Sequence, residues 1–583
     1  MLRISDWIQH PAAAVVLWSA LVAASVLRIV ATYPNTSQAY DEAGHIAAGM
    51  QFLDKGTYTL DQVHPPLAPV AIAVPLYISG LRYPQLPGPQ TDYTYTVIGN
   101  HILYDGGDLA RHLALARTGV LPFFIFGAAV VYLWARHLAG SRAGLVATFL
   151  YCTTPTVLAF ASVAYTDIAA AAMQLMAMLV FSLWLENPNR KTTLWLGLAL
   201  GAAFLAKLTT LLFLPAAMLA MTFVWLIKRG KSKLPLRKRL LQLVAVAVIV
   251  PFIIWAGYFF SLHHVQEITG ITPSNMPSWQ HFPAPVRSLA RGLIVHNPRI
   301  PAGEFLDGIA LAFVLNQDSS ESYLLGQTKA GGWWYFFLIA LAVKSPIPLL
   351  LLTLLGFCAS GFRSAGIHAP PAERADSRWT ALLPLAAVAG ILVATTRVSY
   401  QVGLRHILVV LPLMTIIAAV GAGQIFERIP RLWRWAFFAL VGVLLLWQGA
   451  ESVRAQSDFL AYFNEFAGSD PSAILVTGCD LDCGQDLNRL AAELRRRHID
   501  HVELAVFSSA DLDQLGLPPH ELPDPNGRPH GWIAVSDRPR RTGTGIHENL
   551  PPGYFAGLEA YRPVATVGKT IRLYYVPEVG STP

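Results

Sequence analysis

The sequence predicts an all-α polytopic membrane domain of about eleven transmembrane helices, followed by a soluble α/β domain. Of the 583 residues, 54% are hydrophobic and 14% are charged, whereas soluble domains carry about 25% charged residues. Long apolar runs fill residues 1–452, while residues 453–583 have the mixed composition of a water-soluble protein. This contrast predicts a transmembrane domain over 1–452 and a C-terminal domain over 453–583.

Each predicted span is an apolar run long enough to cross the bilayer core, which takes roughly 20 residues in a helix. A further apolar stretch, 66–81, is interrupted by Pro69 and Pro75, which predicts a re-entrant or interfacial segment. The spans are 11–32, 113–137, 143–163, 167–185, 193–208, 209–227, 240–262, 333–357, 379–396, 404–424 and 435–452.

Basic residues predict the orientation of the chain. Seven Lys and Arg residues lie between positions 228 and 239, and loops rich in positive charge stay in the cytoplasm. With this loop inside, loops 33–112 and 263–332 and the C-terminal domain lie outside. We therefore expect a multi-pass protein of the bacterial inner (plasma) membrane. The net charge of +7 reflects the cytoplasmic loops, and no basic stripe with interleaved aromatic residues indicates a nucleic-acid partner.

The C-terminal domain combines strand and helix patterns. Short alternating apolar runs are typical of strands and occur at 473–477, 502–507, 532–535 and 571–576, while 486–497 has a helical pattern. The mixture predicts a small α/β domain of about 120 residues with a core of its own.

Three acidic residues are expected at the outer face. Asp41 and Glu42 directly follow the first span, and Asp167 lies in the turn between the third and fourth spans. Ionisable groups near membrane depth are costly and tend to be functional, although Asp41 and Asp167 would also suit helix N-caps. The convergence of three acids on one face favours a functional site.

The first outside loop continues with His64-Pro65-Pro66. The prolines fix the backbone and prevent a helix from continuing through the histidine. A histidine held near paired carboxylates suits a phosphate contact, a general acid or a metal ligand, and an interfacial histidine without function is the alternative. No closely spaced His, Cys and Asp cluster makes a metal site obvious in the sequence. We therefore predict no metal ligands and no certain cofactor, and leave a divalent cation open.

Positive charges are expected at the same face. Lys207 lies in the turn between the fifth and sixth spans, and Arg405-His406 begins the tenth span. A phosphate on a lipid carrier requires such cations, because Arg grips phosphate oxygens in a bidentate way and Lys acts as a point charge. An anchor that extends along the interface toward water is the alternative for Arg405.

The order of these motifs resembles that of the GT-C membrane glycosyltransferases. The nearest resemblance is to the bacterial branch related to dolichyl-phosphate-mannose protein mannosyltransferases and the lipid A aminoarabinose transferase. It covers most of the chain, and the order of the motifs is more specific than any single motif. The stretches that carry it are Asp41–His45, Gln62–Leu67, Tyr165–Asp167, Gly403–His406, Tyr462–Glu465 and Asp482–Leu487.

The resemblance implies a reaction and a set of site residues. It implies a sugar donor on a polyprenyl or dolichyl phosphate, a glycan, lipid or protein acceptor, and catalysis outside the cytoplasm among membrane lipids. Asp41 is then the general base that deprotonates the acceptor, and one carboxylate with separated cations suits a single displacement with inversion. The substrate-binding residues that it implies are Glu42, His45, His64, Asp167, Lys207, Arg405 and His406.

Two cysteines depart from the pattern of this family. Related C-terminal domains often read Asp-Trp-Gly-Gln-Asp-Leu, where this chain has Cys483 in place of the tryptophan and Cys479 shortly before it. Because disulfides persist outside the cytoplasm, we predict a Cys479–Cys483 disulfide. Two free thiols are the alternative.

Non-enzymatic proteins are the rival interpretation. A polytopic transporter would explain the apolar spans equally well, and a relative that binds lipid-linked sugar without transferring it would keep the same motifs. Transporters tend to have internal repeats and polar residues at mid-span. Here the acids cluster in outside loops and turns, and the sequence has no internal repeat, which favours the enzyme.

Overall fold

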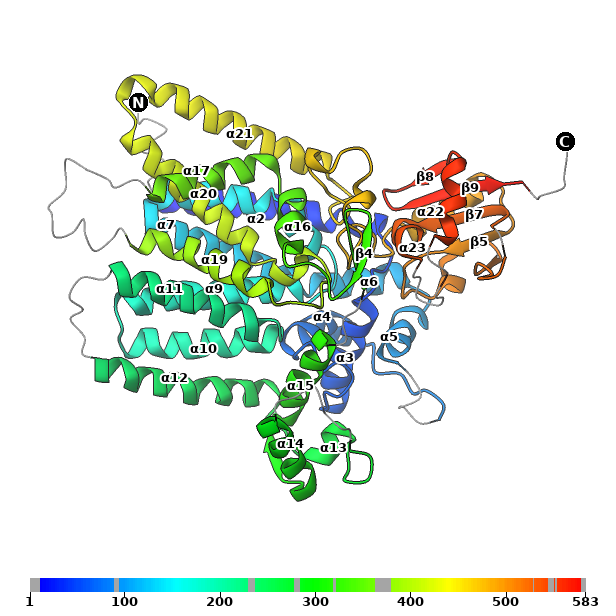
Figure 1. The fold of residues 1–583 in the computed structure, drawn as a ribbon, viewed down its shortest axis with the longest axis horizontal. Helices are drawn as coiled ribbons and strands as arrows, with labels where there is room; N and C mark the ends of the chain where they lie inside the picture. Colours follow the sequence, from blue (N-terminus) through cyan, green and yellow to red (C-terminus); the bar gives the residue numbers. More distant parts are fainter. Residues whose placement is uncertain are drawn as a thin grey trace.

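A bundle of long helices with a small sheet at one end makes up the molecule (Figure 1). The computed structural model describes residues 11–88, 94–228, 236–276, 284–317, 321–361, 379–527, 529–543, 550 and 553–577. Within these ranges, seven helical segments are long and apolar enough to cross a membrane, or eight if one bent pair counts as a span. The helices concerned are α2 (Pro11–Val30), α7 (Leu121–Cys152), α9 (Asp167–Glu186), α11 (Thr210–Lys228), α12 (Leu236–Gly257), α20 (Val410–Arg428) and α21 (Arg434–Arg454), with α16 (Phe336–Lys344) and α17 (Ile347–Gly361) as the pair.

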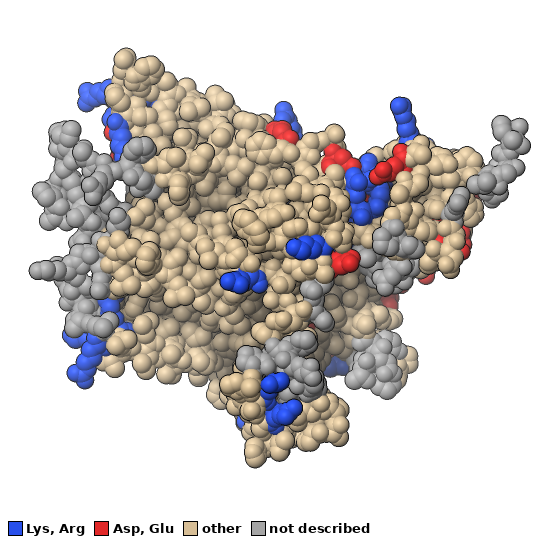
Figure 2. Space-filling model, in the orientation of Figure 1, with Lys and Arg blue, Asp and Glu red and all other residues tan. Residues whose placement is uncertain are grey.

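The outer helices of the bundle present apolar side chains to their surroundings. The span in α12 has a mean hydropathy of 2.4, yet only 11% of its most apolar window is buried. Val248 and Phe252 on this helix are 67% and 54% exposed. Charged side chains are sparse along the flank of the bundle (Figure 2). A helix that is apolar on its exposed faces is suited to lipid and not to water, so the chain is a multi-pass membrane protein.

All of the predicted spans are mainly helical, but four of them differ in detail. Most of 113–137 and the first half of 143–163 lie in α7, which continues through a break at Ala139 and Gly140, where Gly140 has a φ of 82°. The spans at 193–208 and 379–396 correspond to the short helices α10 (Arg190–Ala206) and α19 (Leu383–Thr395). In the predicted cytoplasmic cluster, Arg229, Lys231 and Lys233 lie outside the described residues, and the orientation stays a prediction.

The span predicted over 333–357 corresponds to two helices with a sharp bend between them. Helices α16 and α17 meet at an angle of 116°, and Pro346 lies in the break between them. Proline lacks the N–H that would continue the helical ladder. Lys344 ends α16, and its buried ammonium donates to the carbonyl of Leu460 at 2.9 Å. The bend therefore delivers a charged side chain to the C-terminal region.

The first outside loop folds into four helices that cover the end of the bundle. They are α3 (Glu42–Lys55), α4 (Leu67–Ile78), α5 (Tyr95–Tyr104) and α6 (Leu109–Thr118). Glycines let these helices approach closely: a Cβ at Gly99 would lie 1.9 Å from the carbonyl oxygen of Ala43, and one at Gly49 would lie 2.0 Å from that of Pro69. Helix α4 has 12 residues, too few to cross a bilayer, in agreement with the predicted re-entrant or interfacial segment.

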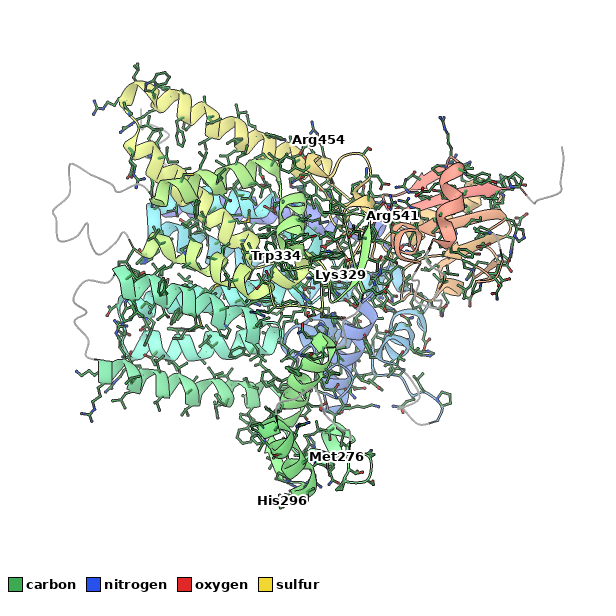
Figure 3. The ribbon with its side chains drawn as sticks, in the orientation of Figure 1. Met276, His296, Lys329, Trp334, Arg454 and Arg541 are labelled. Atoms are coloured by element: carbon green, nitrogen blue, oxygen red, sulfur yellow. A yellow bond between two sulfur atoms is a disulfide. The ribbon has the colours of Figure 1, made fainter. Side chains whose placement is uncertain are left out.

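The second outside loop forms a lobe beside the bundle. Figure 3 places Met276 and His296 in this lobe, away from the bundle, and Lys329 and Trp334 nearer the C-terminal region. The loop contains two antiparallel strand pairs: β1–β2 lies in the lobe, whereas β3–β4 lies beside the C-terminal region. Its elements are β1 (Leu262–His264), α13 (Val265–Thr269), α14 (Ala284–His296), β2 (Arg299–Pro301), α15 (Gly303–Gln317), β3 (Glu321–Leu324) and β4 (Gln327–Ala330).

The C-terminal region contains a five-stranded mixed sheet in the order β6-β5-β7-β9-β8. The strands predicted at 502–507, 532–535 and 571–576 and the helix at 486–497 are present. The strand predicted at 473–477 was wrong: this segment is an irregular loop whose Ile474 carbonyl accepts the Leu325 N–H at 2.9 Å. The elements are α22 (Leu487–Arg496), β5 (Val502–Ala505), β6 (His520–Glu521), β7 (Gly531–Ser536), α23 (Asp537–Thr542), β8 (Ala565–Val567) and β9 (Ile571–Val576).

We expect Gly99→Ala to destabilise the chain. The new methyl group would meet the α3 backbone at 1.9 Å, and overpacking of this kind typically costs about 1–3 kcal/mol. Thermal unfolding of the purified protein in detergent measures the change. Gly423→Ala in α20 is the matched control, because a Cβ there meets nothing within 4 Å. A Gly99→Ala protein as stable as this control would contradict the close packing of α5 on α3.

Candidate active site

The predicted site residues converge where the bundle meets the C-terminal region. Arg405 and Asp41 form an ion pair across the outer end of the bundle. His406 lies within electrostatic range of Lys207, Arg405 and His64. The chain thus brings together residues from the first outside loop, two turns between spans and the segment before α20.

Asp41 occupies the N-cap position of α3 but does not cap it. Its carboxylate forms no capping hydrogen bond with the described residues and instead accepts a hydrogen bond from Arg405. Burial raises the pKa of Asp41, but the nearby Arg405 guanidinium and the two histidines outweigh this effect and hold the pKa below its usual value. Asp41 is therefore an ionised carboxylate, partly exposed at 18%, and available to accept a proton.

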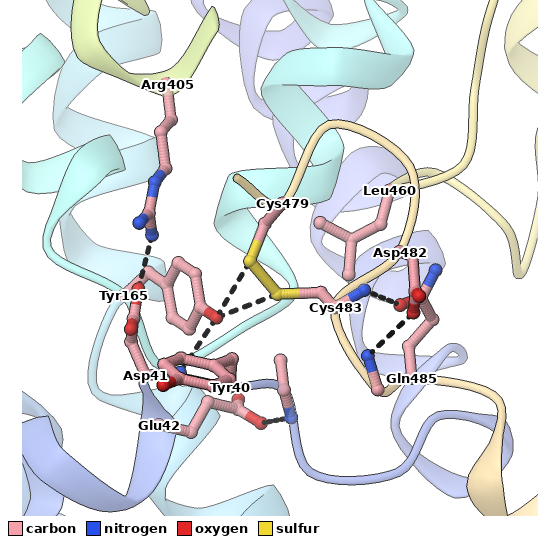
Figure 4. The surroundings of a disulfide bond; sticks show 12 residues. Tyr40, Asp41, Glu42, Tyr165, Arg405, Leu460, Cys479, Asp482, Cys483 and Gln485 are labelled. Atoms are coloured by element: carbon pink, nitrogen blue, oxygen red, sulfur yellow. Dashed lines mark hydrogen bonds and ion pairs between the residues drawn. A yellow bond between two sulfur atoms is a disulfide. The ribbon is translucent and has the colours of Figure 1, made fainter. Parts of the chain in front are cut away.

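Tyr165 links several parts of the site (Figure 4). Its hydroxyl accepts the backbone N–H of Asp41 at 3.0 Å. Its ring lies 5.4 Å from the guanidinium carbon of Arg405 and meets the ring of His45 edge-on at 5.8 Å. Tyr165 thus contacts both members of the central ion pair and orients the backbone that carries Asp41.

Glu42 is held in a fully buried ion pair. Arg117 donates two hydrogen bonds to its carboxylate, at 2.8 and 2.9 Å. The same carboxylate accepts the backbone N–H groups of Ala164 at 2.8 Å and Ala39 at 2.7 Å. Since protein donors surround both oxygens, Glu42 positions the segment before Asp41 and the turn before Asp167.

Asp167 and Lys207 form a second buried pair, with 2.5 Å between the Lys207 ammonium and the Asp167 carboxylate. Asp167 is the first residue of α9, and its negative charge also acts on Arg405. Both cations that the family resemblance assigns to phosphate are therefore paired with carboxylates here. The two ion pairs lie close enough to form one network of alternating charge.

Two histidines and a carboxylate form a separate cluster that the sequence analysis missed. Nδ1 of His45 lies 3.2 Å from an Asp61 oxygen, and Nδ1 of His64 lies 2.9 Å from the other oxygen. Asp61 was not among the predicted site residues, although its spacing of three residues from His64 was a signal that could have drawn notice.

His406 packs near the rings of Phe337 and Tyr400, 6.4 and 6.1 Å away.

The C-terminal region contributes directly to the site. Each carboxylate oxygen of the buried Asp480 accepts the N–H of Leu404 at 3.0 Å, which fixes the residue before Arg405. The Cys483 carbonyl accepts the N–H of Tyr40 at 3.0 Å, which fixes the residue before Asp41. The loop 479–483 therefore holds the backbone next to Arg405 and the backbone next to Asp41. Sequence reasoning missed Asp480, because its partner lies 76 residues earlier.

Cys479 and Cys483 form a disulfide. Its sulfurs lie 3.3 and 3.0 Å from the Tyr165 hydroxyl, as Figure 4 shows. The disulfide thus lies against Tyr165, whose hydroxyl also contacts the backbone of Asp41.

The chain is similar to known proteins in part of its sequence and in its fold. Residues 116–255 match the family model described as dolichyl-phosphate-mannose-protein mannosyltransferase. The structure is similar to the protein O-mannosyltransferase Pmt1-Pmt2 complex of S. cerevisiae bound to the sugar donor, with a TM-score of 0.50 and 11% identity over 79% of this chain and 91% of that chain. The chain therefore has the fold of that complex, the GT-C fold.

A second solved structure is similar to the chain, with a slightly lower TM-score. ArnT from Cupriavidus metallidurans bound to undecaprenyl phosphate has a TM-score of 0.48 at 13% identity, over 95% of this chain and 97% of that chain. No curated protein matches the chain in sequence. The GT-C fold agrees with the fold class predicted from the order of motifs.

We expect the cysteines of this GT-C chain to differ in reactivity. Alkylation of the unfolded, unreduced protein should label Cys152 and Cys358, which are free thiols, and should leave Cys479 and Cys483 unlabelled until a reductant is added. Mass spectrometry of the peptides reports each site. Labelling of Cys479 and Cys483 without reductant would show two free thiols and contradict the disulfide.

The carboxyl group of Asp482, beside the disulfide, should make the stability of the folded chain depend on pH. Burial raises the pKa of Asp482 to about 7, so the folded chain holds this proton more tightly than the unfolded chain. The resulting stabilisation is complete below the unfolded pKa of about 4 and is lost as the pH rises through 7, a change of at most about 4 kcal/mol.

We expect Asp482→Asn to flatten the decline in thermal stability between about pH 5 and about pH 8. Asp513→Asn, at a carboxylate that is 91% exposed, is the matched control. An unchanged profile in Asp482→Asn would show that Asp482 is ionised in the folded protein throughout this range.

Proposed function

We propose that this chain is a glycosyltransferase that moves a sugar from a polyprenyl-phosphate carrier to an acceptor hydroxyl at the extracytoplasmic face of the membrane. The observation that carries the proposal is the ionised Asp41, paired with Arg405 beside the Asp167–Lys207 pair. The match to a mannosyltransferase family model supports sugar transfer as the reaction class.

Asp41 acts as the general base in this proposal. Its depressed pKa keeps it unprotonated at neutral pH, so that it can accept the proton of the acceptor hydroxyl as that oxygen attacks the anomeric carbon. The Tyr165 hydroxyl accepts the backbone N–H of Asp41, and the Cys483 carbonyl accepts that of Tyr40. A base fixed in this way is positioned before the substrate arrives, which lowers the entropic part of the barrier.

Arg405 stabilises the leaving phosphate. It uses one Nη to contact Asp41 and its Nε to contact the Val402 carbonyl at 3.2 Å. A guanidinium has five N–H donors, and those that remain suit a phosphate oxygen. Lys207 adds a second positive charge nearby, and negative charge that grows on the departing phosphate is stabilised most by cations already in place. Attack from one face with departure from the other inverts the anomeric centre.

We expect Asp41→Asn to abolish transfer while leaving the protein folded in the membrane. The amide has the shape of the carboxylate but cannot accept the proton, and loss of a general base typically lowers the rate by about 100-fold to 10,000-fold. The measurement is the amount of lipid-linked sugar in cells whose own gene for the protein is deleted and which express either the variant or the wild-type chain. The sugar donor should accumulate with Asp41→Asn and return to normal with the wild type.

Asp105→Asn is the matched control, because Asp105 is 58% exposed and pairs only with His101 among the described residues. It should clear the donor as the wild type does. If Asp41→Asn also clears the donor, Asp41 is not the base. If purified wild-type chain binds the accumulated lipid-linked sugar but never transfers it, the binding protein considered in the sequence analysis is the better interpretation.

A further inference from the structure

The cluster of His45, Asp61 and His64 has the composition of a metal site. His45 comes from α3, while Asp61 and His64 come from the loop between α3 and α4. All three residues offer ligand atoms within 4.8 Å of one another. His45 and Asp61 are buried, and His64 is partly exposed, with 24% of its side chain accessible. The cluster is therefore shielded on most sides and open through His64.

Hydrogen bonds outside the cluster hold the loop that carries it in shape. The Gln51 side-chain oxygen accepts the N–H groups of Thr59 and Leu60, at 2.9 and 3.3 Å. The Tyr58 hydroxyl donates to the His64 carbonyl. Pro65 and Pro66 follow the histidine and restrict its backbone. A preformed loop lowers the entropy lost when its side chains converge on one ion.

The separations in the cluster match those between ligands of one cation. The two histidine nitrogens lie 3.2 and 2.9 Å from the Asp61 carboxylate oxygens. Zinc binds His nitrogen and carboxylate oxygen at about 2.0–2.2 Å, so neighbouring ligand atoms around it lie roughly 2.9–3.5 Å apart. Hydrogen bonds alone would produce similar separations, so a hydrogen-bonded cluster without metal is the other outcome of the test below.

We propose that His45, Asp61 and His64 bind one divalent transition-metal cation. Imidazole ligands favour Zn²⁺, Cu²⁺, Ni²⁺ or Fe²⁺ over Mg²⁺ and Ca²⁺, which prefer oxygen ligands. Two histidines and one carboxylate leave a coordination position open. The His45 ring also contacts Tyr165, the residue that orients Asp41. The cation thus holds α3, the following loop and the Tyr165 ring in one arrangement, whether or not the chain transfers sugar.

Zinc binding to the full-length purified chain tests the proposal. The protein in detergent is treated with a chelator, freed of it, and titrated with Zn²⁺ while bound metal is measured by mass spectrometry of the element. We expect one ion per chain at saturation. Asp61→Ala and His64→Ala should each weaken binding by more than about tenfold, since loss of even an outer-shell partner costs about 10-fold to 100-fold.

His101→Ala is the matched control. His101 also pairs with an aspartate, Asp105, at 3.1 Å, but it is exposed and belongs to no three-residue cluster among the described residues. Its zinc binding should equal that of the wild type. Wild-type chain that takes up no zinc, or cluster variants that bind it as tightly as the control, would overturn the proposal and leave a hydrogen-bonded cluster only.

Thermal unfolding keeps the test decisive if a cluster variant folds poorly. A ligand that binds the folded state raises the unfolding temperature as its concentration rises. Zn²⁺ should raise that temperature for the wild type and for His101→Ala, and Mg²⁺ at the same concentration should not. Equal effects of the two ions would contradict a histidine site. Because both readouts measure binding, they stand even if the transfer reaction proposed above is wrong.

Discussion

The ion pair between Asp41 and Arg405 joins residues 364 positions apart, and the candidate site is assembled around it. Charges taken out of water are costly unless partners and hydrogen bonds replace the lost hydration. The chain meets this requirement with further pairs, Glu42–Arg117 and Asp167–Lys207. The first pair joins α3 to α6, and the second joins the start of α9 to the end of α10. The arrangement of the outer helices is thereby tied to the arrangement of charge in the site.

The C-terminal region belongs to this site as much as the helices do. Asp480 fixes the backbone next to Arg405, and Cys483 fixes the backbone next to Asp41. The disulfide then fixes Cys479 and Cys483 relative to each other. The composition of residues 453–583 predicts an independent domain, but the first part of this region packs into the end of the bundle. The five-stranded sheet lies beyond it at the end of the molecule (Figure 1), and Ser509 after β5 donates to the Tyr40 carbonyl.

The sequence predicted the membrane helices well, because lipid requires apolar composition along an entire span. It failed at the bend after Lys344, since the residues on both sides are apolar and the partner of the ammonium, Leu460, lies 116 positions later. A distant partner also explains why the strand predicted at 473–477 is absent. Its alternating pattern reflects packing against the β3 hairpin and not a place in the sheet.

The candidate site was predicted residue by residue, but not how its members pair. Ionisable residues next to spans indicated Asp41, Asp167, Lys207 and Arg405, because such positions are costly to fill without a purpose. The sequence could not reveal that Arg117 neutralises Glu42, or that Asp61 joins His45 and His64. Both relationships depend on how the first outside loop folds back over α3, which local patterns do not specify.

The contact between Lys344 and the C-terminal region has a consequence for biogenesis. The buried ammonium at the end of α16 finds its acceptors only in Leu460 and Asp480 among the described residues, and these are synthesised more than a hundred residues after it. Until that segment has been synthesised, the bent helix pair lacks its partners and the Arg405 segment lacks Asp480. The earlier helices can therefore form first, while the candidate site is complete only after residues 479–483 have packed against it and Cys479 and Cys483 have formed their disulfide.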